Sequence, residues 1–239
     1  NIIFLLLIAV YATNVLKKEK YSESLTPVWI PYIFLIITVF AVYIGYIRYT
    51  GEKHTAKAIR YKNDSNWNMV IKEIDLAYNK NIYTLDNTSS PLLWYKGLAY
   101  IKQDNIKDAL KFFLAGYNDN VNHIHSLNNI ATCYGVLGDV ESAKKYYYKA
   151  LDIIPTFRES RVNLAILFYN QKEYVKSLDV ILQSQIDGYS TRIKNNDKFD
   201  YYLSIIFQSY VSNLTDLTNE ELFVFNKIID EFDHQDLQG

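Results

Sequence analysis

The chain has 239 residues, and its 25 lysines and arginines nearly balance 26 aspartates and glutamates, leaving a formal net charge of -1. A near-neutral chain without a basic stripe gives the phosphate backbone little to bind, which argues against nucleic acid as a partner. The single cysteine, Cys133, rules out an intrachain disulfide. The low content of glycine (8) and proline (4) favours a mostly helical chain with short turns.

The first 49 residues have the composition of membrane-spanning segments. Residues 28–47, VWIPYIFLIITVFAVYIGYI, carry no formal charge. At 1.5 Å per residue, a helix of this length spans about 30 Å, the thickness of a bilayer's hydrocarbon core. Trp29 and Tyr32 at its start and Tyr46 near its end are placed like the aromatic residues of membrane interfaces. We therefore predict a complete transmembrane helix over these residues.

A shorter apolar run, residues 1–16, precedes this span. The sequence begins inside that run, at Asn1 rather than at a methionine. We therefore interpret the chain as the C-terminal part of a longer protein and the run as a truncated transmembrane helix. A signal peptide is the alternative, although the run lacks a basic leading region. The two spans would form a hairpin around a short polar loop, residues 17–27.

The basic residues that flank the span give conflicting signals about its orientation. Three lysines in the loop at residues 17–27 favour a cytoplasmic loop, which places the C-terminal domain on the periplasmic side of a bacterial inner membrane. Five basic residues between Arg48 and Lys62 argue the reverse. Short loops follow the positive-inside rule better than long domains do. We therefore predict a periplasmic C-terminal domain.

Residues 50–89 predict a helical hairpin followed by a linker. Ala58 and Tyr61 mark the inner face of the first helix. The inner face of the second is marked by Trp67, Val70, Ile74 and Ala77. Residues 83–91, YTLDNTSSP, are dense in turn formers and predict a loop. This hairpin is a degenerate copy of the repeat that follows it.

Residues 90–187 repeat with a period of 34. Small residues mark the first helix of each of three copies at Gly97, Ala131 and Ala165, and an aromatic residue follows each of them three positions later. A small residue stands twelve positions after each, at Ala109, Ala143 and Ser177. Paired small residues let two helices approach closely. In the central copy, Gly138 and Asp139 predict the turn between the helices, and Pro155 ends the second helix.

This pattern resembles the tetratricopeptide repeat, whose period is 34 residues. The resemblance covers residues 90–187 and is closest in the central copy. It implies helical hairpins that cannot bury their apolar faces alone and therefore stack on one another. The expected fold is all-α: a transmembrane helix or hairpin followed by a tetratricopeptide-type helical solenoid. Residues 188–239 predict two capping helices, 198–214 and 219–232, and a frayed tail.

The sequence shows no catalytic, metal or cofactor site. His123 and His125 are two residues apart, whereas a metal pair on one helical face needs a spacing of three or four. We expect them to cap and pack between repeats. Cys133 lies on a predicted core helix, where a small buried residue is expected rather than a nucleophile.

The first helix of each repeat usually lines the concave face of such a solenoid, and that face is where we expect a protein or peptide partner. The asparagines on it could bond to an extended peptide or a sugar, or could simply be solvated. Lys102 is the main cation there, so a groove that grips a C-terminal carboxylate with paired cations is not expected. The candidate residues are Trp94, Leu98, Lys102, Asn128, Asn129, Thr132, Val162, Asn163, Ile166 and Asn170.

The order of membrane spans and repeats, through PLLWYKGLAY and NHIHSLNNIATCYGVLGD, resembles the C-terminal region of some bacterial O-antigen ligase and polymerase-like membrane proteins. That resemblance implies a parent enzyme that transfers glycan from an undecaprenyl-diphosphate carrier, with a glycan or lipid-linked glycan as a further partner. The family's catalytic arginines and histidines lie upstream of the matched region, so none can be assigned to this chain. The alternative is a membrane-tethered scaffold without enzymatic activity, which assembles an envelope, secretion or signalling complex.

Overall fold

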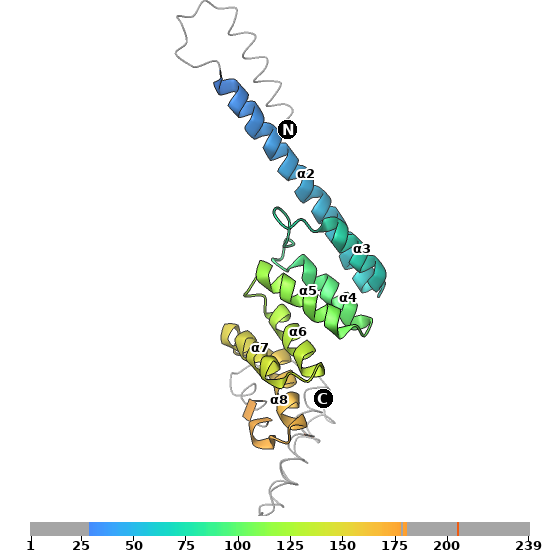
Figure 1. The fold of residues 1–239 in the computed structure, drawn as a ribbon, viewed down its shortest axis with the longest axis vertical. Helices are drawn as coiled ribbons and strands as arrows, with labels where there is room; N and C mark the ends of the chain where they lie inside the picture. Colours follow the sequence, from blue (N-terminus) through green and yellow to red (C-terminus); the bar gives the residue numbers. More distant parts are fainter. Residues whose placement is uncertain (1–28, 178, 181–204, 206–239) are drawn as a thin grey trace, which may run out of the picture. The chain divides into compact units, whose positions relative to one another are not determined.

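The computed structural model describes residues 29–177, 179, 180 and 205, and these residues are helical apart from turns and loops (Figure 1). They fall into two compact units whose boundary in the sequence lies between Asp86 and Asn87. The predicted truncated span, the polar loop after it and the two capping helices lie outside the described residues. The described helices are α2 Ile30–Asn63, α3 Trp67–Ala77, α4 Leu92–Lys102, α5 Ile106–Asp119, α6 Ile124–Val136, α7 Val140–Ile153 and α8 Arg158–Asn170.

The first unit is built on one long helix, α2. It continues for 34 residues without a break, so the predicted span and the first helix of the predicted hairpin are a single element. Most large apolar side chains from Tyr32 to Tyr49 are exposed, with Ile44 and Ile47 half-buried, whereas one face is buried from Gly51 onward. Among the described residues, one helix, Tyr32–Asn63, is long and apolar enough to cross a membrane, by the criteria of length and composition alone.

Helix α3 packs on the second half of α2. Four of the six residues predicted to mark this hairpin are buried, Ala58 of α2 and Val70, Ile74 and Ala77 of α3, whereas Tyr61 and Trp67 are half-buried. The N-terminus of α3 is capped by Asn66, whose Oδ1 accepts a hydrogen bond from the backbone N–H of Met69 at 3.4 Å. Such a cap satisfies one of the amide groups that a helix start leaves without a partner.

The predicted linker after α3 begins as a packed loop. Asn79 and Tyr83 exchange two backbone hydrogen bonds of 2.9 Å. The ring of Tyr83 lies on Gly51, where an added Cβ would be only 2.4 Å from the ring carbon Cδ1. Gly51 is therefore required for this close approach, and Tyr83 is buried against α2.

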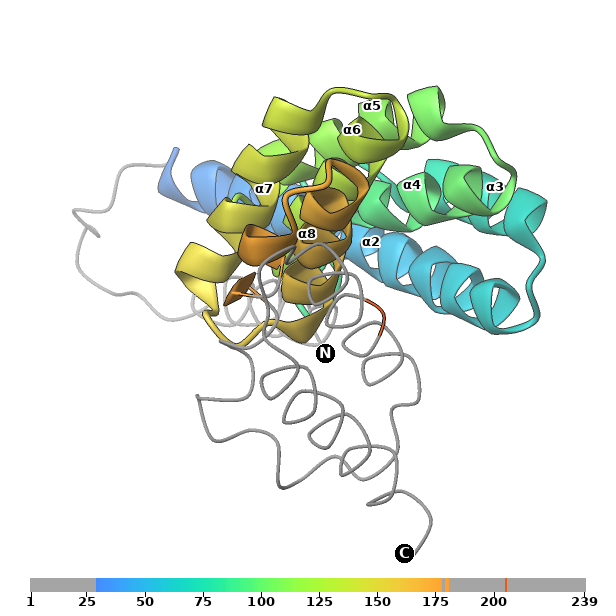
Figure 2. The same cartoon turned by 90° about the horizontal axis from the view of Figure 1, so that it is seen from below.

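The second unit is a stack of helical hairpins, α4–α5, α6–α7 and then α8 with the start of the following helix (Figures 1 and 2). Each connection has a residue in the left-handed region, at Asp104 (φ 60°), Gly138 (φ 86°) and Lys172 (φ 62°). These three residues are 34 apart, so the turn conformation repeats with the sequence. Gly138 and the Asp139 cap confirm the predicted turn of the central copy.

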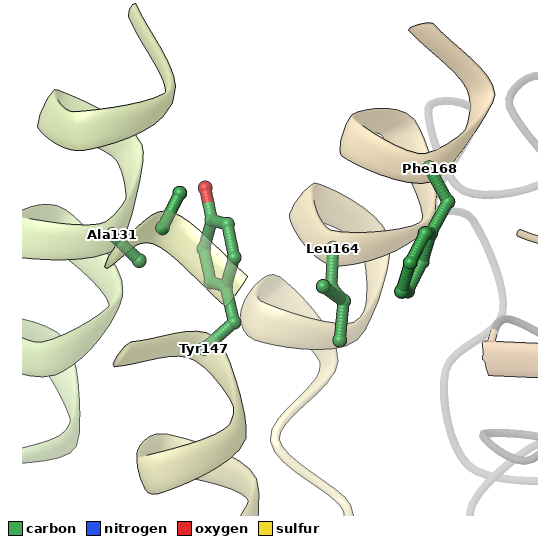
Figure 3. Close-up of a cluster of buried hydrophobic side chains, with 5 residues drawn as sticks. Ala131, Tyr147, Leu164 and Phe168 are labelled. Carbon is green, nitrogen blue, oxygen red and sulfur yellow. The ribbon is translucent and has the colours of Figure 1, made fainter. Parts of the chain in front are cut away.

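The small residues of the repeat place the helices in close contact. A Cβ added at Gly97 would lie 2.5 Å from the ring of Phe113, so that glycine makes room for a fully buried aromatic side chain. In the central copy, buried Ala131 and Ala143 form a cluster with Tyr147 and with two buried residues of α8, Leu164 and Phe168 (Figure 3). Stacking one hairpin on the next therefore completes the core, as expected for a solenoid.

Candidate partner-binding face

The first helices of the second and third copies, α6 and α8, are joined by a cluster of amide side chains. Oδ1 of Asn128 accepts hydrogen bonds from Ser160 Oγ and from Asn163 Nδ2, both at 3.1 Å. Nδ2 of Asn128 donates to Oδ1 of Asn129 at 3.5 Å. We call Asn128, Asn129 and Asn163 the amide cluster.

Thr132 links this cluster to the core of its own hairpin. Its hydroxyl donates to the backbone carbonyl of Asn128 at 2.9 Å and lies 3.0 Å from the phenol oxygen of Tyr147. Burial raises the pKa of the Tyr147 phenol to about 12, so this group is protonated at neutral pH and can donate to Thr132. The contacts with the Asn128 carbonyl and the Tyr147 phenol together hold the Thr132 hydroxyl in one orientation.

These contacts give the amide residues different roles. The carbonyl of the Asn128 side chain is occupied by two donors from α8, and the residue is buried. Asn128 therefore joins the repeats and is not an open binding residue. Asn129 and Asn163 are half-buried beside it and retain surface. Ser160, which completes the arrangement, has no distinctive signal in the sequence.

The predicted face residues of α4 have more varied surroundings. Trp94 and Leu98 are half-buried and pack against the cluster around Phe113 and Ile130, so much of their surface belongs to the core. Lys102 is exposed at the last residue of α4. On α8, Val162 and Ile166 are half-buried and Asn170, the last helical residue, is exposed.

Comparison with known proteins agrees with this architecture. Residues 124–157 match the tetratricopeptide repeat family, the same 34 residues that α6, α7 and their connections occupy. Residues 124–157 are therefore a tetratricopeptide repeat, and the stack of hairpins that contains them is called the tetratricopeptide domain below. A crystal structure of MamA superposes with a TM-score of 0.54 at 15% identity, covering 77% of this chain and 97% of that one. The structure of a tetratricopeptide repeat protein from Parabacteroides merdae superposes with a TM-score of 0.58 at 17% identity. It covers 76% of this chain and 66% of that one. At these identities the structures establish the fold alone.

One relative extends the comparison to sequence. Hsp70-Hsp90 organizing protein 3 of Arabidopsis thaliana is 25% identical over 127 residues, which is 53% of this chain but 22% of that protein. The chain therefore spans about a fifth of this relative. None of these comparisons supports the O-antigen ligase resemblance or a glycan partner, and both stay predictions.

The two histidines of the tetratricopeptide domain have structural roles. His123 caps α6, since its Nδ1 accepts a hydrogen bond from the backbone N–H of Ser126 at 3.2 Å. The ring of His125 packs between Trp94 and Phe157, at centroid distances of 6.1 and 5.3 Å. Capping and packing between repeats were expected from the sequence and are confirmed. Within the described residues, no three histidine, cysteine, aspartate or glutamate side chains converge as a metal site would require.

Cys133 lies inside the tetratricopeptide domain, 1% exposed and packed against Phe113 and Ile130. Burial raises the pKa of its thiol to about 12. Because the thiolate is the reactive form, this cysteine is unreactive at neutral pH. The prediction of a small buried core residue is confirmed.

Proposed function

We propose that the tetratricopeptide domain is a protein-interaction module that holds an extended peptide segment of its partner across the amide cluster. The observation that carries this proposal is the arrangement of Asn129 and Asn163. They lie on neighbouring first helices on either side of Asn128, which accepts a hydrogen bond from Asn163 at 3.1 Å and makes a longer contact of 3.5 Å with Asn129. An amide side chain offers one acceptor and two donor hydrogens, which matches the peptide groups of an extended chain.

The charge of this face indicates which peptides it takes. Lys102 is the single charged side chain among the predicted face residues, and exposed Glu159 lies one turn before Asn163 on α8. A peptide that bears neutral or apolar side chains fits this surface better than an acidic C-terminus, which needs several cations. The relative named Hsp70-Hsp90 organizing protein 3 favours a protein partner as the general class.

We further propose that α2 tethers this module to a bacterial inner membrane. Most of the large apolar side chains from Tyr32 to Tyr49 are exposed, and water would make such a surface costly while lipid would not. A lysine in place of Ile37 should weaken insertion, because a charge at mid-span costs about 3 kcal/mol on insertion scales. Extraction of membranes with alkaline carbonate measures this. Release of the original chain into the soluble fraction would refute the anchor.

The periplasmic position of the tetratricopeptide domain stays part of this proposal. An alkaline phosphatase fused after Gly239 is active only in the periplasm, so activity supports that side of the membrane and inactivity places the domain in the cytoplasm. The proposed tether needs no enzymatic parent. About ten spans and a large polar loop upstream in the gene would instead favour the O-antigen ligase-like parent.

The peptide proposal is tested with a library of immobilised 12-residue peptides probed by the whole chain in detergent. Affinity for any captured peptide is then measured by titration. Replacing Asn129 and Asn163 together by alanine should weaken binding about tenfold, since each lost hydrogen bond contributes about 0.5–1.5 kcal/mol. Lys145→Ala, an exposed change on α7, is the matched control. Unchanged affinity in the double variant, or capture of no peptide, would overturn the proposal.

A further inference from the structure

The surface of α2 changes from mostly exposed to partly buried along its length. Up to Tyr49 most of its large apolar side chains are exposed, with Tyr46 and Tyr49 at 66% and 67%; Ile44 and Ile47 are half-buried. Two residues later Gly51 is buried, and Thr55 and Ala58 continue the buried face. The stretch that fits lipid therefore ends within one helical turn of the point where packing against protein begins.

The element that packs at this transition is the loop after α3, residues 78–86, which we call the Tyr83 loop. Its Tyr83 ring rests on Gly51. Burial raises the pKa of the Tyr83 phenol, and the charges of Glu52 and Arg48 also act on it. These two residues lie within one turn of Gly51. The loop is thus level with the end of the apolar stretch.

The opposite end of the hairpin lies much farther along α2. Helix α3 runs back along α2, as shown by the contact of Glu73 with His54 at 2.7 Å and by the Asn66 turn that follows Asn63. Asn63 is twelve residues beyond Gly51, which is about 18 Å at 1.5 Å per residue. The hairpin therefore has a near end, at the Tyr83 loop, and a far end, at Asn63.

We infer that the Tyr83 loop lies against the headgroup layer of the membrane that α2 enters. This inference rests on the proposed membrane anchor. Lys80 and Asn81 are exposed in the loop and Ile82 is half-buried. A lysine suits phospholipid phosphates, and a short apolar residue suits the boundary of the acyl chains. Because α2 is continuous through the transition, the hairpin keeps a fixed height above the bilayer.

The test uses variants of the whole chain that each carry one added cysteine, labelled with a bimane fluorophore. Each variant is placed in nanodiscs whose lipids carry a nitroxide quencher on the headgroup. Asn81→Cys reports the near end and Asn63→Cys the far end; both positions are exposed. Native Cys133 stays in place because its buried thiol resists labelling, and the unsubstituted chain checks this. We expect several-fold stronger quenching at residue 81 than at residue 63.

The same experiment separates the two proposals. If the chain fails to enter nanodiscs, the anchor is wrong. If it enters but residues 81 and 63 are quenched equally weakly, the anchor stands and the loop contact is overturned. Tyr83→Ala should release the loop and lower quenching at residue 81, whereas Tyr83→Phe, which keeps the ring on Gly51, should preserve it. Unfolding of the Tyr83→Ala variant would leave the comparison of residues 81 and 63 decisive.

Discussion

Two hairpins of this chain, α2–α3 and α6–α7, differ in the residues that make the contact between their two helices. Between α6 and α7 the contact is made mainly by buried Ala131, Ala143 and the ring of Tyr147, and the one hydrogen bond described between them joins the neutral hydroxyls of Thr132 and Tyr147. Between α2 and α3 small residues again allow close approach, but the interface also contains Glu73, which is 5% exposed and is paired with His54 across 2.7 Å.

The difference shows how each hairpin specifies its partner helix. A contact made mainly of apolar surface can be repeated along a solenoid, because each copy offers the next the same apolar surface. A buried carboxylate can be accommodated in one register only, since it must reach its partner or lose its hydrogen bond. The repeat hairpins should therefore be most sensitive to changes of volume, and the first hairpin to loss of a polar partner.

The largest effect is expected from volume in the repeats. Phe113→Ala should lower the free energy of unfolding of the second unit by about 3–5 kcal/mol, the usual cost of removing a fully buried aromatic side chain. The neighbouring Phe112→Ala is the matched control, because that ring is half-buried and stacks on Tyr100. Denaturant unfolding followed by circular dichroism measures both. Equal losses would mean that the small residues do not organise the core.

A smaller loss is expected in the first hairpin. His54→Ala removes the imidazole that lies 2.7 Å from the buried Glu73 carboxylate and should cost about 1–3 kcal/mol. Amide hydrogen exchange of α3 reports this unit separately from the repeats. Glu73→Gln in the same background should restore part of the loss, because a neutral amide is cheaper to bury than a charge. Faster exchange in the double variant than in His54→Ala would contradict the pairing.

The amide cluster gives the next prediction. Asn128→Ala removes the acceptor for Ser160 and Asn163 and should cost about 1–2 kcal/mol. Asn129→Ala should cost less than about 0.5 kcal/mol, because its one contact within the cluster is 3.5 Å long. Thermal unfolding distinguishes the two. Equal melting temperatures for both variants would mean that Asn128 does not join the repeats.

The fold of the repeats could be predicted from the sequence because its determinants are local and periodic. The spacing of Gly97, Ala131 and Ala165 fixes which faces meet, and the match over residues 124–157 and the packing of Phe113 agree with it. The continuity of α2 was harder to predict, because the change from apolar to amphipathic composition near Tyr49 suggests a boundary where the backbone has none.

The roles of the polar residues depend on contacts that the sequence does not encode locally. Asn128 was expected to face a ligand, but its partner Ser160 is 32 residues away. Glu73 carries no sign of burial, and its partner His54 is 19 residues away. The turn formers of residues 83–91 indicate a loop, but the packing of Tyr83 on Gly51 depends on where α3 returns along α2.

The smallest change in the free energy of unfolding is expected for substitutions in the turns between the helices of each repeat. Gly138 and Lys172 occupy equivalent left-handed positions, with φ of 86° and 62°. A side chain there costs about 1 kcal/mol, which glycine avoids. Gly138→Ala should therefore destabilise the second unit and Lys172→Gly should stabilise it, each by about 1 kcal/mol in denaturant unfolding. Lys145→Gly, inside α7, is the control and should destabilise by a similar amount. If Lys172→Gly behaved like Lys145→Gly, the left-handed turn would not recur in the third copy, and the repeats would be less alike than α4–α5 and α6–α7 indicate.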